Sequence, residues 1–261
     1  MPKFAANLTM MFTEHEFMQR FAAAEKAGFK AVEFLFPYDY QATEIARCLT
    51  SHQLENVLFN LPPGDWAAGE RGIAALPGRE AEFAQGVDRA LEYALILGTK
   101  RLHMMAGIAP AGVAPELLEK TYLHNLQYAA KKLNQHGITL LIEPINTQDM
   151  PGYFLNLQAQ AHRLREQSAE PNVQVQMDFY HVQMAEGDLA NKLKKYIHAV
   201  GHVQIAGVPG RNEPDDGEIN YPYLFRLLDA LGYDGWVGCE YRPRGITEQG
   251  LGWLNAANTT I

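Results

Sequence analysis

The sequence contains only two cysteines, Cys48 and Cys239, among its 261 residues. Two cysteines cannot build the framework of several disulfides that stabilises small secreted domains, so the composition is typical of a reducing compartment. Cys239 falls in the apolar phase of an expected strand, and we expect it to be a small buried hydrophobic side chain.

An excess of positive charge is also missing. Lys and Arg number 22 against 30 Asp and Glu, which gives a formal net charge of −8. Proteins that bind nucleic acids or membrane surfaces usually present a basic field, so the composition predicts neither partner. An anionic small molecule is still compatible with this charge, because a few local cations are enough to bind it.

Long apolar segments are absent as well. No run reaches the roughly 18 apolar residues of a membrane-spanning helix. The first segment, MPKFAANLTMMF, lacks a long apolar core and a cleavage site, and Glu14 and Glu16 follow it closely. These features predict a soluble, cytoplasmic protein.

Strand-like and helix-like segments alternate along the chain, whose apolar content of 47% is typical of a globular core. Amphipathic stretches separate the strands, and Gly28, Gly98, Gly137 and Gly232 stand where helices should end. The expected strands are Phe4–Leu8, Lys30–Leu35, Asn56–Asn60, Arg101–Met105, Ile138–Glu143, Val173–Asp178, Gly201–Ile205 and Trp236–Glu240.

This alternation predicts an α/β fold, a parallel eight-stranded (β/α)₈ TIM barrel that forms a single domain over residues 1–261. A doubly wound open sheet is the alternative, although no G-x-G-x-x-G follows the first strand. Two connections, Leu61–Gly78 and Ala206–Asn220, are longer than a turn requires. Long loops at this end of a barrel usually cover or build a site.

The last four expected strands each end in a side chain that carries a metal-competent oxygen. In each strand the apolar residues occupy one phase of the two-residue period, and the polar end residue occupies the other. The polar side chains would therefore meet inside the C-terminal mouth of the barrel. These residues are Glu143, Asp178, Gln204 and Glu240.

Three carboxylates cannot share a dry interior without a compensating charge, and a divalent cation is the simplest compensation. An all-oxygen ligand set selects a hard ion, so the prediction is Mg²⁺ or Mn²⁺. Taken singly, each acid could instead be a helix cap or an ion-pair partner. Their common phase on consecutive strands favours the metal site.

The first half of the chain shows the same phase near its strand ends, in Asn7, Glu33, Asn60 and His103. These residues could simply form hydrogen bonds in a polar barrel mouth. Together with the other four, they predict a polar pocket that continues round the ring.

Two histidines lie close to the expected metal ligands. His181 follows Asp178 by three residues and could meet a substrate hydroxyl or a metal-bound oxygen, or be a surface histidine at a helix start. His202 shares the phase of Gln204 one layer deeper, so it should orient Gln204 or Asp178.

The two long loops supply further candidates. Arg211 could clamp a substrate carboxylate by paired hydrogen bonds, with Glu213 beside it, or it could be an exposed loop residue. The earlier loop offers Trp66, Glu70 and Arg71 as parts of a lid that would exclude water.

Carboxylates placed across a divalent ion suit proton abstraction next to a carbonyl, which leaves an enediolate. One glutamate removes the proton, and the same or the facing one returns it to the adjacent carbon. The reaction class is aldose–ketose isomerisation or epimerisation.

Eight segments of the chain are distinctive: FAANLTMMF, AVEFLFPYDY, NLPPGDWAAGERGIAALPGRE, LLIEPIN, QMDFYHVQ, HVQIAG, RNEPDDGEINYPYLF and GWVGCEYRPRG. Through these segments the chain resembles the hydroxypyruvate isomerase family of xylose isomerase-like barrels nearly end to end. The resemblance implies interconversion of hydroxypyruvate and tartronate semialdehyde, with Glu143 and Glu240 as the acid/base pair and all four strand-end residues as metal ligands. The wider superfamily often has a histidine where Gln204 stands.

Several alternatives stay open at this point. Similar proteins act on 2-oxo-tetronates, one hydroxymethylene longer, and the motifs do not separate the two substrates. A metal-dependent phosphodiesterase of the repair-endonuclease type would need a histidine-rich multi-zinc cluster and a basic groove. A non-catalytic sugar-acid binder would not need two facing glutamates. Barrels of this size often dimerise, so a homo-oligomer is compatible, but no stretch indicates an interface.

Overall fold

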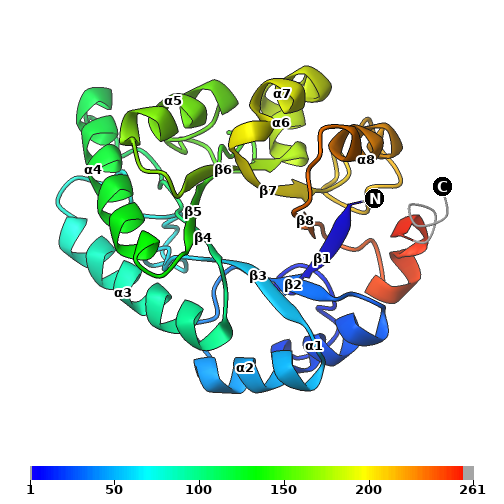
Figure 1. Ribbon diagram of the computed structural model, residues 1–261. Coiled ribbons are helices and arrows are strands. Elements are labelled where there is room, and N and C mark those ends of the chain that lie inside the picture. Colours follow the sequence, from blue (N-terminus) through cyan, green and yellow to red (C-terminus); the bar gives the residue numbers. More distant parts are fainter. Residues whose placement is uncertain (1, 255–261) are drawn as a thin grey trace.

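A computed structural model describes residues 2–254 of the chain, in which eight parallel strands close into a barrel in chain order. Strand β1 pairs with β2 on one side and with β8 on the other, and this closure excludes the open doubly wound sheet. Figure 1 shows the helices arranged around the outside of the strands. The predicted TIM barrel is confirmed, and residues 1 and 255–261 of the predicted single domain lie outside the described part.

The described elements alternate as the sequence predicts. The strands are β1 (Lys3–Asn7), β2 (Ala31–Glu33), β3 (Glu55–Asn60), β4 (Arg101–His103), β5 (Thr139–Ile142), β6 (Val173–Asp178), β7 (Val200–Ile205) and β8 (Trp236–Cys239). The helices are α1 (Phe17–Lys26), α2 (Ala42–Ser51), α3 (Glu80–Leu97), α4 (Pro115–Asn134), α5 (Gln158–Ser168), α6 (Phe179–Ala185), α7 (Leu189–Tyr196) and α8 (Tyr221–Ala230), with 3₁₀ turns η1 (Ile197–Ala199) and η2 (Thr247–Gly250).

Two apolar clusters of unequal size lie on the two faces of the sheet. The large outer cluster joins the strands to the helices and includes Leu140 and Ile142 of β5. A small inner cluster contains Leu141 together with Ala5, Ala31, Val57 and Leu58. The alternation along β5 therefore confirms the predicted phases, and the inner cluster fills the barrel below a polar upper layer.

Several strands end one or two residues before the predicted limits. Glu143 follows the last residue of β5, and Glu240 follows the last residue of β8. The Glu240 backbone N–H still donates to the Ile205 carbonyl at 3.2 Å, so the chain direction of the strand continues to the acid. Both acids therefore lie at the C-terminal edge of the sheet, where the loops begin.

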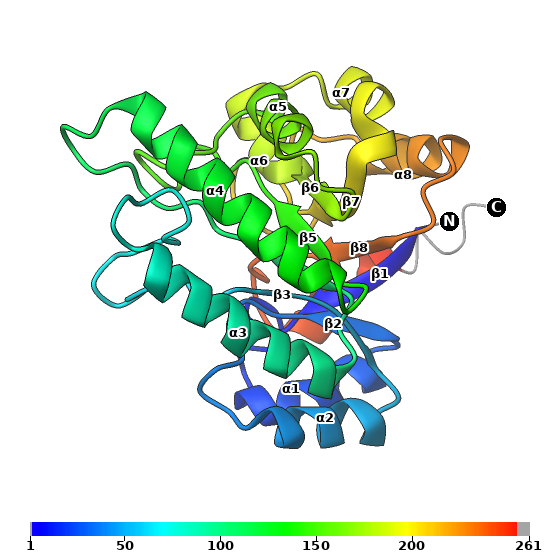
Figure 2. The same cartoon turned by 60° about the vertical axis from the view of Figure 1, so that its left-hand side comes forward.

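The loop that follows β3 is fastened to the loop that follows β4. Gly72 and Ala106 form an isolated antiparallel bridge, and the Ala75 N–H donates to the Ala106 carbonyl at 2.8 Å. A Cβ on Gly72 would collide with the Met105 carbonyl, and Gly72 has a φ of +101°, so only glycine fits there. Figure 2 shows α3 and α4 side by side on the outer surface, with the loops that precede them at their left-hand ends. Within residues 2–254, the helices do not meet the length and apolarity of a membrane span.

Candidate active site

The strand-end acids and Gln204 gather in one buried group at the C-terminal mouth. Asp178 and Gln204 are paired residues on neighbouring strands β6 and β7, and each has 1% of its surface exposed. Gln204 Nε2 donates to Glu240 Oε2 at 2.6 Å. Glu143 is buried beside them, and the charge of Glu240 contributes to raising its pKa.

Burial makes these carboxyls resist ionisation. Desolvation raises the pKa of Glu240 to about 8, although Arg211 opposes the shift. Desolvation also raises the pKa of Asp178 to about 6, again against Arg211. Burial raises the pKa of Glu143 well above its ordinary value, and the charges of Glu240 and Asp178 add to this effect. The three acids need positive charge before all can ionise together.

Arg211 supplies such a charge from the long loop after β7. Its Nη2 lies 2.6 Å from Glu240 Oε1 and 3.8 Å from Asp178 Oδ2. Its guanidinium carbon lies 4.9 Å from the centre of the Tyr180 ring, and Nη1 lies 3.5 Å from Asp149 Oδ2. The sequence left open an exposed loop arginine, whereas the structure buries Arg211 against the acids of the site.

Gln204 is held by a hydrogen bond from Gln176, a residue that was not predicted from the sequence. Gln204 Oε1 accepts from Gln176 Nε2 at 2.6 Å, while Gln204 Nε2 also donates to Glu33 Oε1 at 2.7 Å. Gln204 thus turns its N–H groups toward the carboxylates. Gln176 shares the inward phase of Asp178, so the two-residue period could have identified it.

A divalent ion is compatible with this donor set. Glu143 Oε1 and Asp178 Oδ2 are buried without hydrogen-bond partners, which suits two free ligand oxygens. Gln204 would have to rotate its amide to present Oε1. Gln176 now turns its Nε2 to Gln204, so its amide would have to rotate as well. Its Oε1, which is buried without a partner, would then accept the N–H that Gln204 turns away from the carboxylates.

His181 lies at the same mouth, at the start of α6. Atoms of Glu143, Asp178 and His181 lie within 4.8 Å of one another, a spacing that could hold a metal ion. His181 Nδ1 lies 2.7 Å from Asn146 Nδ2, and Nε2 lies 3.7 Å from Asp178 Oδ2. Burial, followed by the charge of Arg211, lowers the pKa of His181 well below its ordinary value, so the ring is neutral.

The first-half residues form the other side of the mouth. Asn7 Nδ2 donates to Glu33 Oε1 at 3.0 Å and to Glu240 Oε2 at 3.2 Å. Asn60 Oδ1 lies 3.3 Å from His103 Nδ1, and His103 Nε2 lies 3.6 Å from Glu143 Oε2. Burial lowers the pKa of His103 to about 3, so this ring is also neutral.

Glu33 links the deeper layer to the mouth. His202 Nε2 lies 2.7 Å from Glu33 Oε2, and the other Glu33 oxygen accepts from Gln204. His202 therefore acts on Gln204 through Glu33, while the sequence analysis expected a more direct role. A Cβ on Gly238 of β8 would collide with the Glu33 carboxylate, so this glycine makes room for it.

Two predicted binding residues have partners elsewhere. The Glu213 carboxylate accepts from Arg244 Nε at 2.9 Å and from the Arg244 backbone N–H. The Glu70 carboxylate accepts from Arg79 Nη1 at 2.6 Å, and this bond lowers its pKa. Both contacts fasten loops. They could not be predicted, because residues on a long loop follow no regular period that would show which way a side chain points.

The lid candidates lie at the surface of the same loop as Glu70. The Arg71 guanidinium lies 3.9 Å from the centre of the Trp66 ring, which also contacts Phe36. Trp66 has 36% of its surface exposed. Whether this loop moves as a lid stays a prediction.

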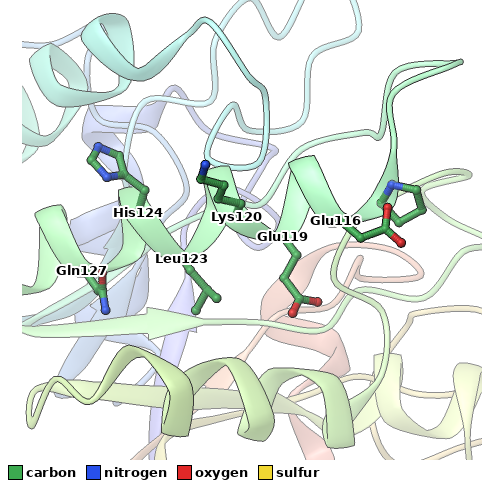
Figure 3. Close-up of a pocket in the computed structure, with 7 residues that line it drawn as sticks. Glu116, Glu119, Lys120, Leu123, His124 and Gln127 are labelled. Atoms are coloured by element: carbon green, nitrogen blue, oxygen red, sulfur yellow. The ribbon is translucent and has the colours of Figure 1, made fainter.

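A separate pocket of about 600 Å³ runs along the outside of α4. Figure 3 shows Lys120 and His124 pointing to one side of the helix and Glu119, Leu123 and Gln127 to the other. Glu119 is engaged by Arg163 at 2.7 Å. None of the predicted site residues lines this pocket, whose lining is Pro115, Glu116, Glu119, Lys120, Leu123, His124 and Gln127.

The barrel and its polar mouth can be compared with known proteins. The model of the xylose isomerase-like TIM barrel family matches residues 21–257, and the chain belongs to this family. A 2-oxo-tetronate isomerase of Cupriavidus necator is 58% identical, covering 97% of this chain and 98% of that protein. A hydroxypyruvate isomerase of Escherichia coli is 49% identical, covering 98% of this chain and 99% of that protein.

A solved structure matches equally well but carries a different description. A crystal structure from Brucella melitensis, described as an AP endonuclease of family 2, is 56% identical with a TM-score of 0.97, covering 98% of this chain and 99% of that one. A 3-keto-D-glucoside 4-epimerase of Escherichia coli, 22% identical with a TM-score of 0.77, covers 98% of this chain and 99% of its own. The latter shows the common fold alone.

Proposed function

We propose that this protein is an aldose–ketose type isomerase of short hydroxy-oxo-acids, with Glu143 and Glu240 as its acid/base pair. The observation that carries the proposal is the pair itself. Two glutamates stand at the mouth of one barrel, and burial keeps the pKa of both high. A carboxyl whose pKa lies near the working pH can both accept and return a proton. The isomerase relatives at 58% and 49% identity support this reading.

The first candidate substrate is hydroxypyruvate, which would be interconverted with tartronate semialdehyde. One glutamate takes a proton from C3, and the electron pair moves into the C2 carbonyl to give an enediolate. A proton then returns to C2, and the proton of the C3 hydroxyl passes to the oxygen on C2, so that atoms and charge balance. Arg211 and His181 provide donors for the carboxylate and for the oxygen on which negative charge develops.

We further propose that a divalent ion, Mg²⁺ or Mn²⁺, is held by Glu143, Asp178, Gln204 and Glu240. When bound, it would supply Lewis-acid stabilisation of the enediolate oxygens. The unpartnered oxygens of Glu143 and Asp178 support this assignment. The carboxylates and an amide oxygen favour a hard ion over zinc.

The second candidate substrate is a 2-oxo-tetronate, which the 58% identity to the Cupriavidus necator isomerase favours. The same proton transfer operates on the longer chain, since only the group beyond the reacting carbons differs. The endonuclease reading has less support. The net charge of −8 disfavours a polyanionic partner. Within residues 2–254, one group of side chains could hold a metal ion, and it consists of two acids and one histidine, not a histidine-rich cluster.

A coupled assay that compares hydroxypyruvate with 2-oxo-tetronate isomers tests this function. The protein should be stripped with a chelator, its residual metal measured, and activity recorded before and after Mg²⁺ or Mn²⁺ is added. We expect turnover of at least one substrate that falls with metal removal and returns on addition. No turnover of either acid would reject the isomerase, and full activity without metal would reject only the ion.

A further inference from the structure

The side chain of Asn146 lies behind His181, in the loop between β5 and α5. Its Oδ1 accepts from two backbone N–H groups, those of Gln148 at 3.0 Å and Asp149 at 2.9 Å. Backbone N–H groups can only donate, so the oxygen of this amide must face them. The Nδ2 group of Asn146 is therefore the atom that faces His181.

Two N–H donors of Asn146 face the Nδ1 atom of His181. Asn146 Nδ2 lies 2.7 Å from His181 Nδ1, and the Asn146 backbone N–H lies 3.5 Å from the same atom. A ring nitrogen that faces two donors must be the acceptor. In a neutral imidazole the proton then lies on the other nitrogen, Nε2.

We infer that Asn146 is a positioning residue that fixes His181 as the Nε2–H tautomer and so makes it a hydrogen-bond donor to substrate, not a metal ligand. This inference deepens the proposed function and rests on it for the role of the donor. A metal ligand would have to present a bare Nε2, and Nδ1 would then carry a proton against the Asn146 donors.

The donor points into the reacting space. His181 Nε2 lies 3.7 Å from Asp178 Oδ2, and Arg211 Nη2 lies 3.8 Å from the same buried, unpartnered oxygen. Arg211 Nη2 also lies at hydrogen-bond distance from His181 Nε2, 3.3 Å, and a guanidinium can only donate, so it competes with Asn146 for the bare ring nitrogen. Nδ1 faces two donors, the nearer at 2.7 Å, and Arg211 Nη2 has Glu240 Oε1 as an acceptor at 2.6 Å, so the Asn146 contacts decide the tautomer. Arg211 Nη2 and the Nε2–H of His181 then converge on one acceptor position beside Asp178. A substrate carbonyl or hydroxyl oxygen placed there would receive both N–H groups as its negative charge develops.

The chain contains a matched control pair in Asn60 and His103. There the amide oxygen, Asn60 Oδ1, faces the ring nitrogen His103 Nδ1 at 3.3 Å. This pair favours a proton on Nδ1, the opposite tautomer. Changing Asn60 to Asp keeps an acceptor at that position, whereas changing Asn146 to Asp replaces the donor by an acceptor.

The test uses ¹⁵N NMR of the protein with ring-labelled histidine, in which His181→Gln assigns the signals of His181. In the unmodified protein we expect an unprotonated Nδ1 and a protonated Nε2. Asn146→Asp should reverse this pattern and lower kcat on the order of a hundredfold, the usual loss for one donor at a developing charge. Asn60→Asp should leave the tautomers of both histidines unchanged.

The outcomes separate the two proposals. A proton on Nδ1 of His181 in the unmodified protein would overturn the inference, and that measurement needs no variant to fold. An Asn146→Asp protein that loses activity with the tautomer unchanged would also overturn it, because Asn146 would then have a merely structural role. The expected tautomer in a protein without isomerase activity would leave the role of Asn146 standing and reject the proposed function.

Discussion

Glu240 shows at the scale of one residue how the site balances burial against charge. Desolvation raises its pKa to about 8, and Arg211 at 2.6 Å opposes this without cancelling it. The folded protein therefore favours the protonated carboxyl through the neutral range. A bound cation would reverse that preference by stabilising the carboxylate.

This shift predicts how the stability of the metal-free protein depends on pH. Because the folded pKa of Glu240 lies above the unfolded value, its contribution is fully present below about pH 4.3 and is lost as pH rises through about 8. Thermal unfolding of chelated protein should show a falling contribution across this range, and Glu240→Gln should flatten it. An identical pH profile in the variant would contradict the raised pKa.

Arg211 and a divalent cation neutralise the same acids, so they should oppose each other. Mn²⁺ titration of the chelated protein should show that Arg211→Met binds the ion more tightly, on the order of tenfold, the size usual for coupled binding. The exposed Arg242, two residues beyond Glu240, provides the control, since Arg242→Met removes the same charge without touching the acids. Equal tightening in both variants would show that only the general field changed.

At the scale of the element, β8 combines a glycine with the acid that follows it. Gly238 and Glu240 share the inward phase, and the missing side chain of Gly238 leaves room for the Glu33 carboxylate. Glu33 in turn holds Asn7 and Gln204, both of which donate to Glu240. β8 therefore shapes the site both through the missing side chain of Gly238 and through the carboxyl group of Glu240, which follows the strand.

Gly238→Ala should therefore displace Glu33 and loosen the hydrogen bonds to Glu240. We expect a cost of about 1–3 kcal/mol in the free energy of unfolding, the usual size for overpacking, together with a larger loss of kcat than of substrate affinity. Chemical denaturation and steady-state kinetics measure these quantities. Gly245→Ala, at a position where a Cβ meets nothing within 4 Å, is the control. Equal effects of the two substitutions would reject the account of Gly238.

Strand period and chain order made the barrel and its acids predictable from the sequence. The phases of Glu143, Asp178 and Glu240 could be read directly, because side chains on a strand alternate between two faces. Contacts made by loops could not be read in this way. Nothing in the sequence showed that Glu213 meets Arg244, or that Asn146 stands behind His181.

At the scale of the whole molecule, the closed barrel turns distant residues into neighbours. Asn7 from β1 donates to Glu240 after β8, a contact that exists only because the first and last strands pair. The small inner cluster lies inside the barrel below, and the acids of the site gather at the C-terminal end above it. The molecule therefore offers one buried, acid-rich mouth for a small substrate and its ion.

Exchange with deuterated water tests most directly whether Glu143 and Glu240 move the substrate proton. The substrate that turns over should be incubated with metal-loaded protein in D₂O, and deuterium at the carbons flanking the carbonyl followed by NMR. We expect incorporation with the unmodified protein and none above background with Glu240→Gln, at matched metal content. Full incorporation by Glu240→Gln would contradict the account.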